Sequence, residues 1–267
     1  SIHTAAGFFG GFLGPVVVIP LTGWFDWQTA ILVSAASGMV MAAVMIAQSH
    51  ALEDPVREAP SGDGASRTRA DLALLLSAPV LMGLLFYVGL AMFGGALGNF
   101  SVSALGEMYA EVSLEELGIV LSAYLFAAPA GVLVGGGVAD RIKRHDVFAA
   151  GCFVGIAVLV FCIAAIDLPL WMIAVLVGLA GLLYGLVAPS RDMLIRSMAK
   201  PGEMGRVFGF VSVGFNIGGM TAPLIFGYIL DNADPTGVFW VAGFVALLTV
   251  PTVLVTGSRG RAATEAK

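Results

Sequence analysis

The chain alternates between long apolar runs and short polar segments. A helix that crosses a bilayer needs about 20 mostly apolar residues. No Lys, Arg, Asp or Glu falls in the middle of any run of that length. Sustained period-two alternation is absent from these runs, so we interpret them as helices rather than barrel strands. The predicted spans are eight: 5–22, 27–48, 71–95, 114–138, 147–166, 169–190, 206–230 and 236–256.

Composition supports an all-α polytopic membrane protein. The chain has 58% hydrophobic and 12% charged residues and a mean hydropathy of +0.95, outside the range of soluble domains. No basic stripe is present, which argues against nucleic-acid binding. Cys152 and Cys162 stand ten residues apart without a CxxC or Cys/His pattern, so we expect neither a metal nor another cofactor. The three histidines lie at the ends of the predicted spans, which argues against an enzyme.

All 13 basic residues lie in alternate connectors. The connectors at 23–26, 98–113, 167–168 and 231–235 contain no Lys or Arg. The positive-inside rule therefore predicts that the basic connectors and both ends of this chain are cytoplasmic. We expect the membrane to be a plasma membrane, the inner membrane of a bacterium. The acidic outer connector is interpreted as a solvated face, with a cation-collecting mouth as the alternative; it carries Glu107, Glu111, Glu115 and Glu116.

An internal repeat divides the chain. A Gly-Gly pair precedes a proline in two spans that enter from the same side, 208 residues apart. If the repeat unit has six spans, residues 1–48 hold the last two helices of one unit and residues 71–256 a complete second unit. Residues 49–70 then form a cytoplasmic linker and 257–267 a tail, and four further spans are expected upstream. The repeated positions are Gly10, Gly11, Gly14 and Pro15, and Gly218, Gly219 and Pro223.

Residues 136–145, with Gly136, Asp140, Arg141 and Arg144, resemble the cytoplasmic loop motif of the major facilitator superfamily, G-x-L-A-D-R-x-G-R-R. The sequence departs from that pattern where Lys143 replaces the usual glycine and at the last basic position, a histidine. The resemblance implies a helical bundle of which this chain holds helices five to twelve of twelve.

Two further segments support the resemblance. Arg191 and Asp192, followed by Arg206, look like the family's connector between helices ten and eleven. Gly10–Pro15 resembles, in weakened form, the fifth-helix motif associated with proton-coupled antiporters.

The resemblance implies a secondary transporter that works by alternating access. We expect Asn216 and Tyr124 to line a substrate cavity, with Tyr87 and Phe215 as weaker candidates; an interhelical hydrogen bond or simple packing is the alternative. Asp140 is expected to accept from groups such as Arg144 and to form a conformational latch, or else to anchor the loop at the headgroups.

No charge is expected in the middle of a span, which favours a hydrophobic or amphipathic compound, as in drug efflux. Coupling to protons is what the family resemblance implies, with the proton-coupling residues expected in the first unit. The alternatives are an uptake permease for an organic anion or a sugar-type metabolite, and a membrane protein of this type that does not transport. The expected partners are the lipid bilayer, a small-molecule substrate and protons. We expect the full-length protein to be monomeric.

Overall fold

Seven helices in the described part of the chain are long and apolar enough to cross a membrane. The structure, a computed structural model, describes residues 6–7, 9–10, 17–18, 20–22, 24–48, 74–199 and 203–265. Half of predicted span 5–22 and the whole of linker 49–70 therefore lie outside the described residues, and so do Gly11, Gly14 and Pro15. The elements are α2 (Trp27–Ala47), α4 (Ala78–Gly95), the π-helical η2 (Ala96–Phe100), α5 (Ser101–Met108), α6 (Leu114–Ala139), α7 (His145–Ala165), α8 (Leu170–Met198), α9 (Met204–Asn232) and α10 (Gly237–Glu265).

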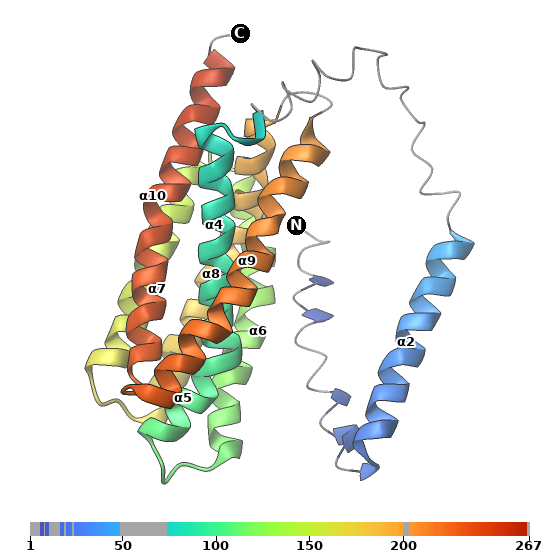
Figure 1. Cartoon of the computed structure of the whole chain (residues 1–267), viewed down its shortest axis with the longest axis vertical. Helices are drawn as coiled ribbons and strands as arrows, with labels where there is room; N and C mark the ends of the chain where they lie inside the picture. The colour runs from blue at the N-terminus through green and yellow to red at the C-terminus, as the bar shows by residue number, and fades with distance from the viewer. Residues whose placement is uncertain are drawn as a thin grey trace. The chain divides into compact units, whose positions relative to one another are not determined.

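The chain forms two units, which are described separately. One contains residues 71–267 and hence helices α4 to α10; the other contains residues 10–70 and helix α2. In the larger unit, successive long helices run in opposite directions and stand side by side (Figure 1). In the smaller unit, α2 begins at Asp26, whose carboxylate accepts a hydrogen bond from the Thr29 amide at 2.6 Å. The division of the sequence into domains stays a prediction.

Three expected span ends were wrong. The eighth span does not end at 256, because α10 continues to Glu265. The third span does not end at 95, because the helix continues through η2 and α5 to Met108, and the outer connector begins only after it. The sixth span does not end at 190, because α8 continues to Met198. The helix continues because apolar residues follow its first charged residues, namely Met193, Leu194 and Ile195. Arg191 and Asp192 are therefore helical residues and not part of a connector.

Glycines allow two pairs of helices to approach closely. A Cβ atom at Gly135 of α6 would lie 2.7 Å from the Leu186 carbonyl oxygen of α8, and one at Gly181 would lie 2.7 Å from the Tyr124 carbonyl oxygen. Because only a missing Cβ permits this approach, the parallel helices α6 and α8 form one tightly packed pair.

Helices α4 and α9 form the second tightly packed pair. A Cβ atom at Gly214 or Gly218 of α9 would lie 2.5 Å from a carbonyl oxygen of α4, that of Leu84 or Val88 respectively. Gly218 of the repeated Gly-Gly motif thus packs against α4, whereas a Cβ at Gly219 would meet nothing within 4 Å. In the described part of the chain, the glycine that packs on α4 together with Gly218 is thus Gly214, four residues earlier, and not the adjacent Gly219 of the repeat.

Candidate functional site

Arg191 lies in α8 at the junction of the two helix pairs. Its guanidinium carbon is 5.2 Å from the centre of the Tyr87 ring on α4 and 5.5 Å from that of the Phe215 ring on α9. The side chain is only 11% exposed. Cationic guanidinium groups stack favourably on aromatic faces, and the attraction grows when water is excluded. Arg191 therefore joins α8 to both helices of the α4–α9 pair.

Asp192 is the anionic partner of Arg191. The Nε and Nη2 atoms of Arg191 both lie 2.9 Å from one oxygen, Oδ1, of Asp192. The Asp192 side chain is 33% exposed, three times as much as its partner. Arg191 lies toward the end of α8 and not in its middle, but the C-terminal extension of this helix brings its guanidinium between apolar helices, a burial that the sequence did not predict.

Tyr87 and Phe215, two of the predicted cavity residues, pack directly on each other. Their ring centres are 4.6 Å apart, and the Tyr87 ring also stands edge-on to Phe208 at 6.5 Å. Tyr87 is 1% exposed, and its hydroxyl has no hydrogen-bond partner in the described part of the chain. The hydroxyl of Ser190, the residue before Arg191, is also buried without a hydrogen-bond partner in the described part of the chain.

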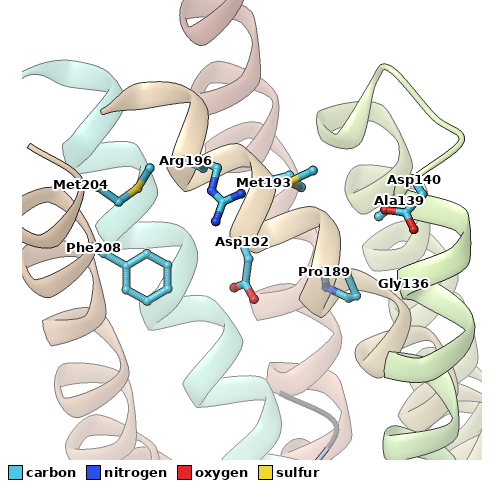
Figure 2. A pocket seen from close by; sticks show the side chains of 9 residues that line it. All are labelled: Gly136, Ala139, Asp140, Pro189, Asp192, Met193, Arg196, Met204 and Phe208. Atoms are coloured by element: carbon cyan, nitrogen blue, oxygen red, sulfur yellow. The ribbon is translucent and has the colours of Figure 1, made fainter. Parts of the chain in front are cut away.

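A hollow of about 390 Å³ opens beside this cluster (Figure 2). It lies between α6, α8 and α9, at the end of the bundle that carries the basic connectors. Asp192 and Arg196 face it from successive turns of α8, with Phe208 on one side and Asp140 on the other (Figure 2). The complete lining is Gly136, Ala139, Asp140, Pro189, Asp192, Met193, Arg196, Met204 and Phe208.

The loop motif is placed differently from what its sequence suggested. Gly136 is buried in α6, and Asp140 follows the last turn of that helix as an exposed residue. Arg144 forms its ion pair with Asp146 at 3.6 Å, so the prediction that Asp140 pairs with Arg144 was wrong. Because Asp146 lies in the first turn of α7, the partial positive charge of that helix terminus also favours it. Arg141 is exposed beside Asp140.

Asp146 is a buried charge that sequence reasoning missed. It is 1% exposed, and a Cβ atom at Gly257 of α10 would lie 2.7 Å from its carboxyl carbon. The available signal was an acidic residue directly after a basic loop and before an apolar run, as expected near a helix N-terminus. Asp146 thus fixes the packing of α10 against the start of α7.

The two leading cavity candidates are not part of the Arg191 cluster. Tyr124 is 4% exposed and pairs with Tyr184, with ring centres 6.3 Å apart. The Tyr184 hydroxyl donates to the Leu90 carbonyl oxygen of α4 at 3.3 Å. Asn216 lies on the exposed side of α9, and no hydrogen bond is found for its side chain among the described residues. The role of Tyr124 and Asn216 in a cavity stays a prediction. Arg206 is exposed in the first turn of α9 and Pro223 is exposed within that helix, and the roles predicted for them in the connector and in the repeat also stay predictions.

The opposite end of the bundle has a polar contact of its own. The Tyr109 hydroxyl donates to Asp167 Oδ1 at 3.1 Å and accepts from the Leu168 amide at 3.4 Å. Partial burial and the neighbouring carboxylate raise the pKa of the Tyr109 hydroxyl, and the Leu168 amide opposes them. This contact joins the connector before α6 to the connector before α8.

Among the described residues, no group of three or more His, Cys, Asp or Glu side chains has the arrangement of a metal site. Cys152 and Cys162 are both free thiols. The side chains that carry chemistry in the described bundle are therefore the charged and aromatic groups around Arg191 and along the hollow.

Comparison with known proteins agrees with the resemblance read from the loop motif. Residues 81–267 match the family described as the Major Facilitator Superfamily. The chain is also 25% identical, over 272 residues, to the fosmidomycin resistance protein of Escherichia coli (strain K12). That alignment covers 97% of this chain and 62% of the relative, so the chain spans less than two thirds of the relative's length. The helical fold class is confirmed, and the family is one of transporters and not of enzymes. Since the family match extends over more than half of the chain, this chain belongs to the major facilitator superfamily and is an integral membrane protein with multiple spans.

Proposed function

We propose that this chain is the C-terminal part of a secondary transporter that exports a small amphipathic solute in exchange for protons. Membership of the family supports transport, and the name of the relative, a resistance protein, supports export. Uptake of a metabolite is the competing direction. The proposal places the basic connectors on the cytoplasmic side of a bacterial inner membrane, with residues 1–48 as the end of a first six-helix unit.

The observation that carries the proposal is the position of the hollow. It separates the end of the α6–α8 pair from the start of α9, whereas within each glycine-packed pair the backbones touch. Two closely packed pairs with a gap lined by charged residues between their ends provide a place where a cytoplasmic contact is made in one state and broken in another. Asp140, at the rim of this gap, is our candidate for the latch.

The described interior is suited to a solute with a large apolar part. Around Arg191, aromatic rings of α4 and α9 supply the surface, namely Tyr87, Phe208 and Phe215. Ligand sites of this type combine mostly apolar walls with a few polar groups that fix orientation. We propose Tyr124 and Asn216, which lie outside this cluster, as further cavity residues.

Drug susceptibility tests the direction of transport. The complete gene would be expressed in a bacterium that lacks its own fosmidomycin exporter, and growth would be measured against rising fosmidomycin concentration. Export predicts that the inhibitory concentration rises several-fold, and that this rise disappears when a protonophore collapses the proton gradient. A lower inhibitory concentration would indicate uptake and contradict the proposal.

Transport itself is tested without a drug phenotype. Everted membrane vesicles are energised, and an acridine dye reports the proton gradient across the membrane. Addition of fosmidomycin should discharge part of the gradient in vesicles that hold the protein and not in vesicles without it. A gradient that is insensitive to the solute in both preparations would contradict proton exchange with this solute.

A further inference from the structure

Arg191 has more hydrogen-bond donors than its described neighbours use. A guanidinium group carries five N–H donors and no acceptor. In the described part of the chain, its hydrogen-bonding acceptor is a single oxygen of Asp192, which takes both Nε and Nη2. The rings of Tyr87 and Phe215 cover its faces but accept no conventional hydrogen bond. One edge of a largely buried cation is thus left for another acceptor.

Tyr87 adds a second buried donor at the same place. Its hydroxyl is fully enclosed and has no partner among the described residues, although its ring touches the guanidinium. An unpaired buried hydroxyl costs free energy, and proteins keep such groups where a ligand satisfies them. The guanidinium can only donate, and the Tyr87 hydroxyl can donate beside it, so an acceptor-rich, negatively charged ligand would satisfy both groups.

We propose that Arg191 and Tyr87 recognise an oxyanion on the transported solute, a carboxylate or a phosphonate. This inference rests on the proposed transport function and specifies the class of its substrate. Guanidinium groups bind both kinds of oxyanion through two parallel hydrogen bonds. The apolar part of the solute lies against Phe208 and Phe215, whose rings flank Tyr87.

Asp192 acts as the internal competitor of this anion. It holds Arg191 when no solute is bound, yet it uses only one of its two oxygens for that contact. Asp192 lines the hollow, whereas Arg191 is not one of its lining residues. An arriving oxyanion replaces the Asp192 carboxylate on Arg191, so the buried cation stays paired in both states and the cost of an isolated buried charge is avoided.

The test measures binding rather than transport. Detergent-solubilised protein from the complete gene is equilibrated with radiolabelled benzoate, phenylphosphonate or benzamide, three solutes with the same ring and different head groups. Both anions should bind at least tenfold more tightly than neutral benzamide, and the stronger of the two identifies the preferred oxyanion. Equal affinity for benzamide would overturn the proposal.

Three conservative variants decide the roles of the residues. Asp192→Asn should tighten anion binding by about tenfold, because the competing carboxylate is gone. Tyr87→Phe should weaken it by about fivefold while leaving the ring in place. Arg191→Lys should retain only part of the affinity, since an ammonium lacks the planar fork. A weaker or unchanged affinity in Asp192→Asn would contradict the competition.

Matched controls lie elsewhere in the same unit. Lys143→Gln removes an exposed charge from the loop before α7, and Tyr228→Phe removes an exposed hydroxyl from α9. Both should leave anion binding within twofold of the unmodified protein, and a larger loss in either would mean that the effect is not specific to the Arg191 cluster. Selective anion binding without any transport would leave this inference standing and overturn the proposed function. Transport of neutral solutes without anion binding would leave the proposed transport function standing and overturn this inference.

Discussion

The guanidinium carbon of Arg191 lies 5.2 Å from the centre of the Tyr87 ring, and the hydroxyl of that same ring is buried without a partner in the described chain. The first contact stabilises the junction of α4 and α8, with a cation–π attraction of about 1–2 kcal/mol in a desolvated position. The second destabilises it. One residue therefore combines a structural benefit with a cost, as is expected where a protein keeps a group for a ligand.

This combination predicts opposite effects of two substitutions at position 87. Tyr87→Phe retains the ring and removes the unpaired hydroxyl, so the free energy of unfolding should rise by up to about 1 kcal/mol. Tyr87→Leu removes the ring from Arg191 and Phe215 and should lower it by about 2 kcal/mol or more. Thermal unfolding of the purified protein in detergent checks both. A lower melting temperature in Tyr87→Phe would show that the hydroxyl has a partner in the native protein.

Two adjacent glycines of α9 are predicted to respond differently to alanine. Gly218→Ala places a Cβ 2.5 Å from the Val88 carbonyl oxygen, so α4 and α9 must separate, at a cost of about 1–3 kcal/mol. Gly219→Ala meets nothing within 4 Å and should leave stability unchanged or raise it slightly, because alanine is the better helix former. Melting temperatures of both variants check this prediction, with Gly219→Ala as the control for Gly218→Ala. Equal losses would contradict the close packing at Gly218.

Asp140 is predicted to act on conformational balance rather than on folding. Asp140→Asn removes the charge at the rim of the hollow, and we expect the transport rate to fall about tenfold. Membrane insertion and melting temperature should stay the same, because the side chain is exposed. Initial rates in proteoliposomes made with the complete protein measure the effect. Asp231→Asn, an exposed acidic residue at the other end of the bundle, serves as the control, and unchanged transport in Asp140→Asn would exclude the latch.

Tyr109 predicts a dependence of stability on alkaline pH. Its folded pKa lies above the ordinary value of 10.0, mainly because of partial burial. A group that holds its proton more tightly when folded contributes its full stabilisation below the unfolded pKa and loses it as the pH rises through the folded pKa. The Tyr109→Phe variant should therefore be less stable than the original protein at pH 7.5, by about 0.5 kcal/mol for the lost hydrogen bond.

That difference should shrink as the pH is raised from about 9 toward 11, since only the original protein carries the ionisable hydroxyl. Melting temperatures of both proteins across this range provide the measurement. Asp167→Asn keeps a hydrogen-bond acceptor but removes the carboxylate, so it should raise the pKa of Tyr109 less. The loss of stability at alkaline pH should then occur at a lower pH than in the original protein. A difference between original and variant that grows with pH would contradict the assignment.

The sequence alone determined the class of protein, most of the spans and the sides of the membrane to which the connectors are assigned. These properties follow from local composition, because hydrocarbon excludes charged side chains wherever they stand in the fold. The loop around Asp140 could also be recognised as similar to the family motif, because that motif is a run of consecutive residues. The dependence on local composition also explains the three wrong span ends, since a helix does not have to end where its apolar run meets the first charge.

Only the tertiary structure decided which faces of these helices meet. A helix that is apolar on all sides has no periodic signal that distinguishes a packed face from one toward lipid. Hence the sequence could not tell Gly218 from Gly219, although the first lies against α4 and a Cβ atom at the second would meet nothing within 4 Å among the described residues. It could not pair Arg144 with Asp146 either, because that contact depends on where α7 begins.

The same reason applies to Arg191. In the sequence it is one basic residue among several near the end of a span, and it was assigned to a connector. In the structure, the extension of α8 and the close approach of α8 to α6 place it against Tyr87 and Phe215, which come from helices far away in the chain. Burial of a charge is a property of its neighbours, and those neighbours are set by packing rather than by the local sequence.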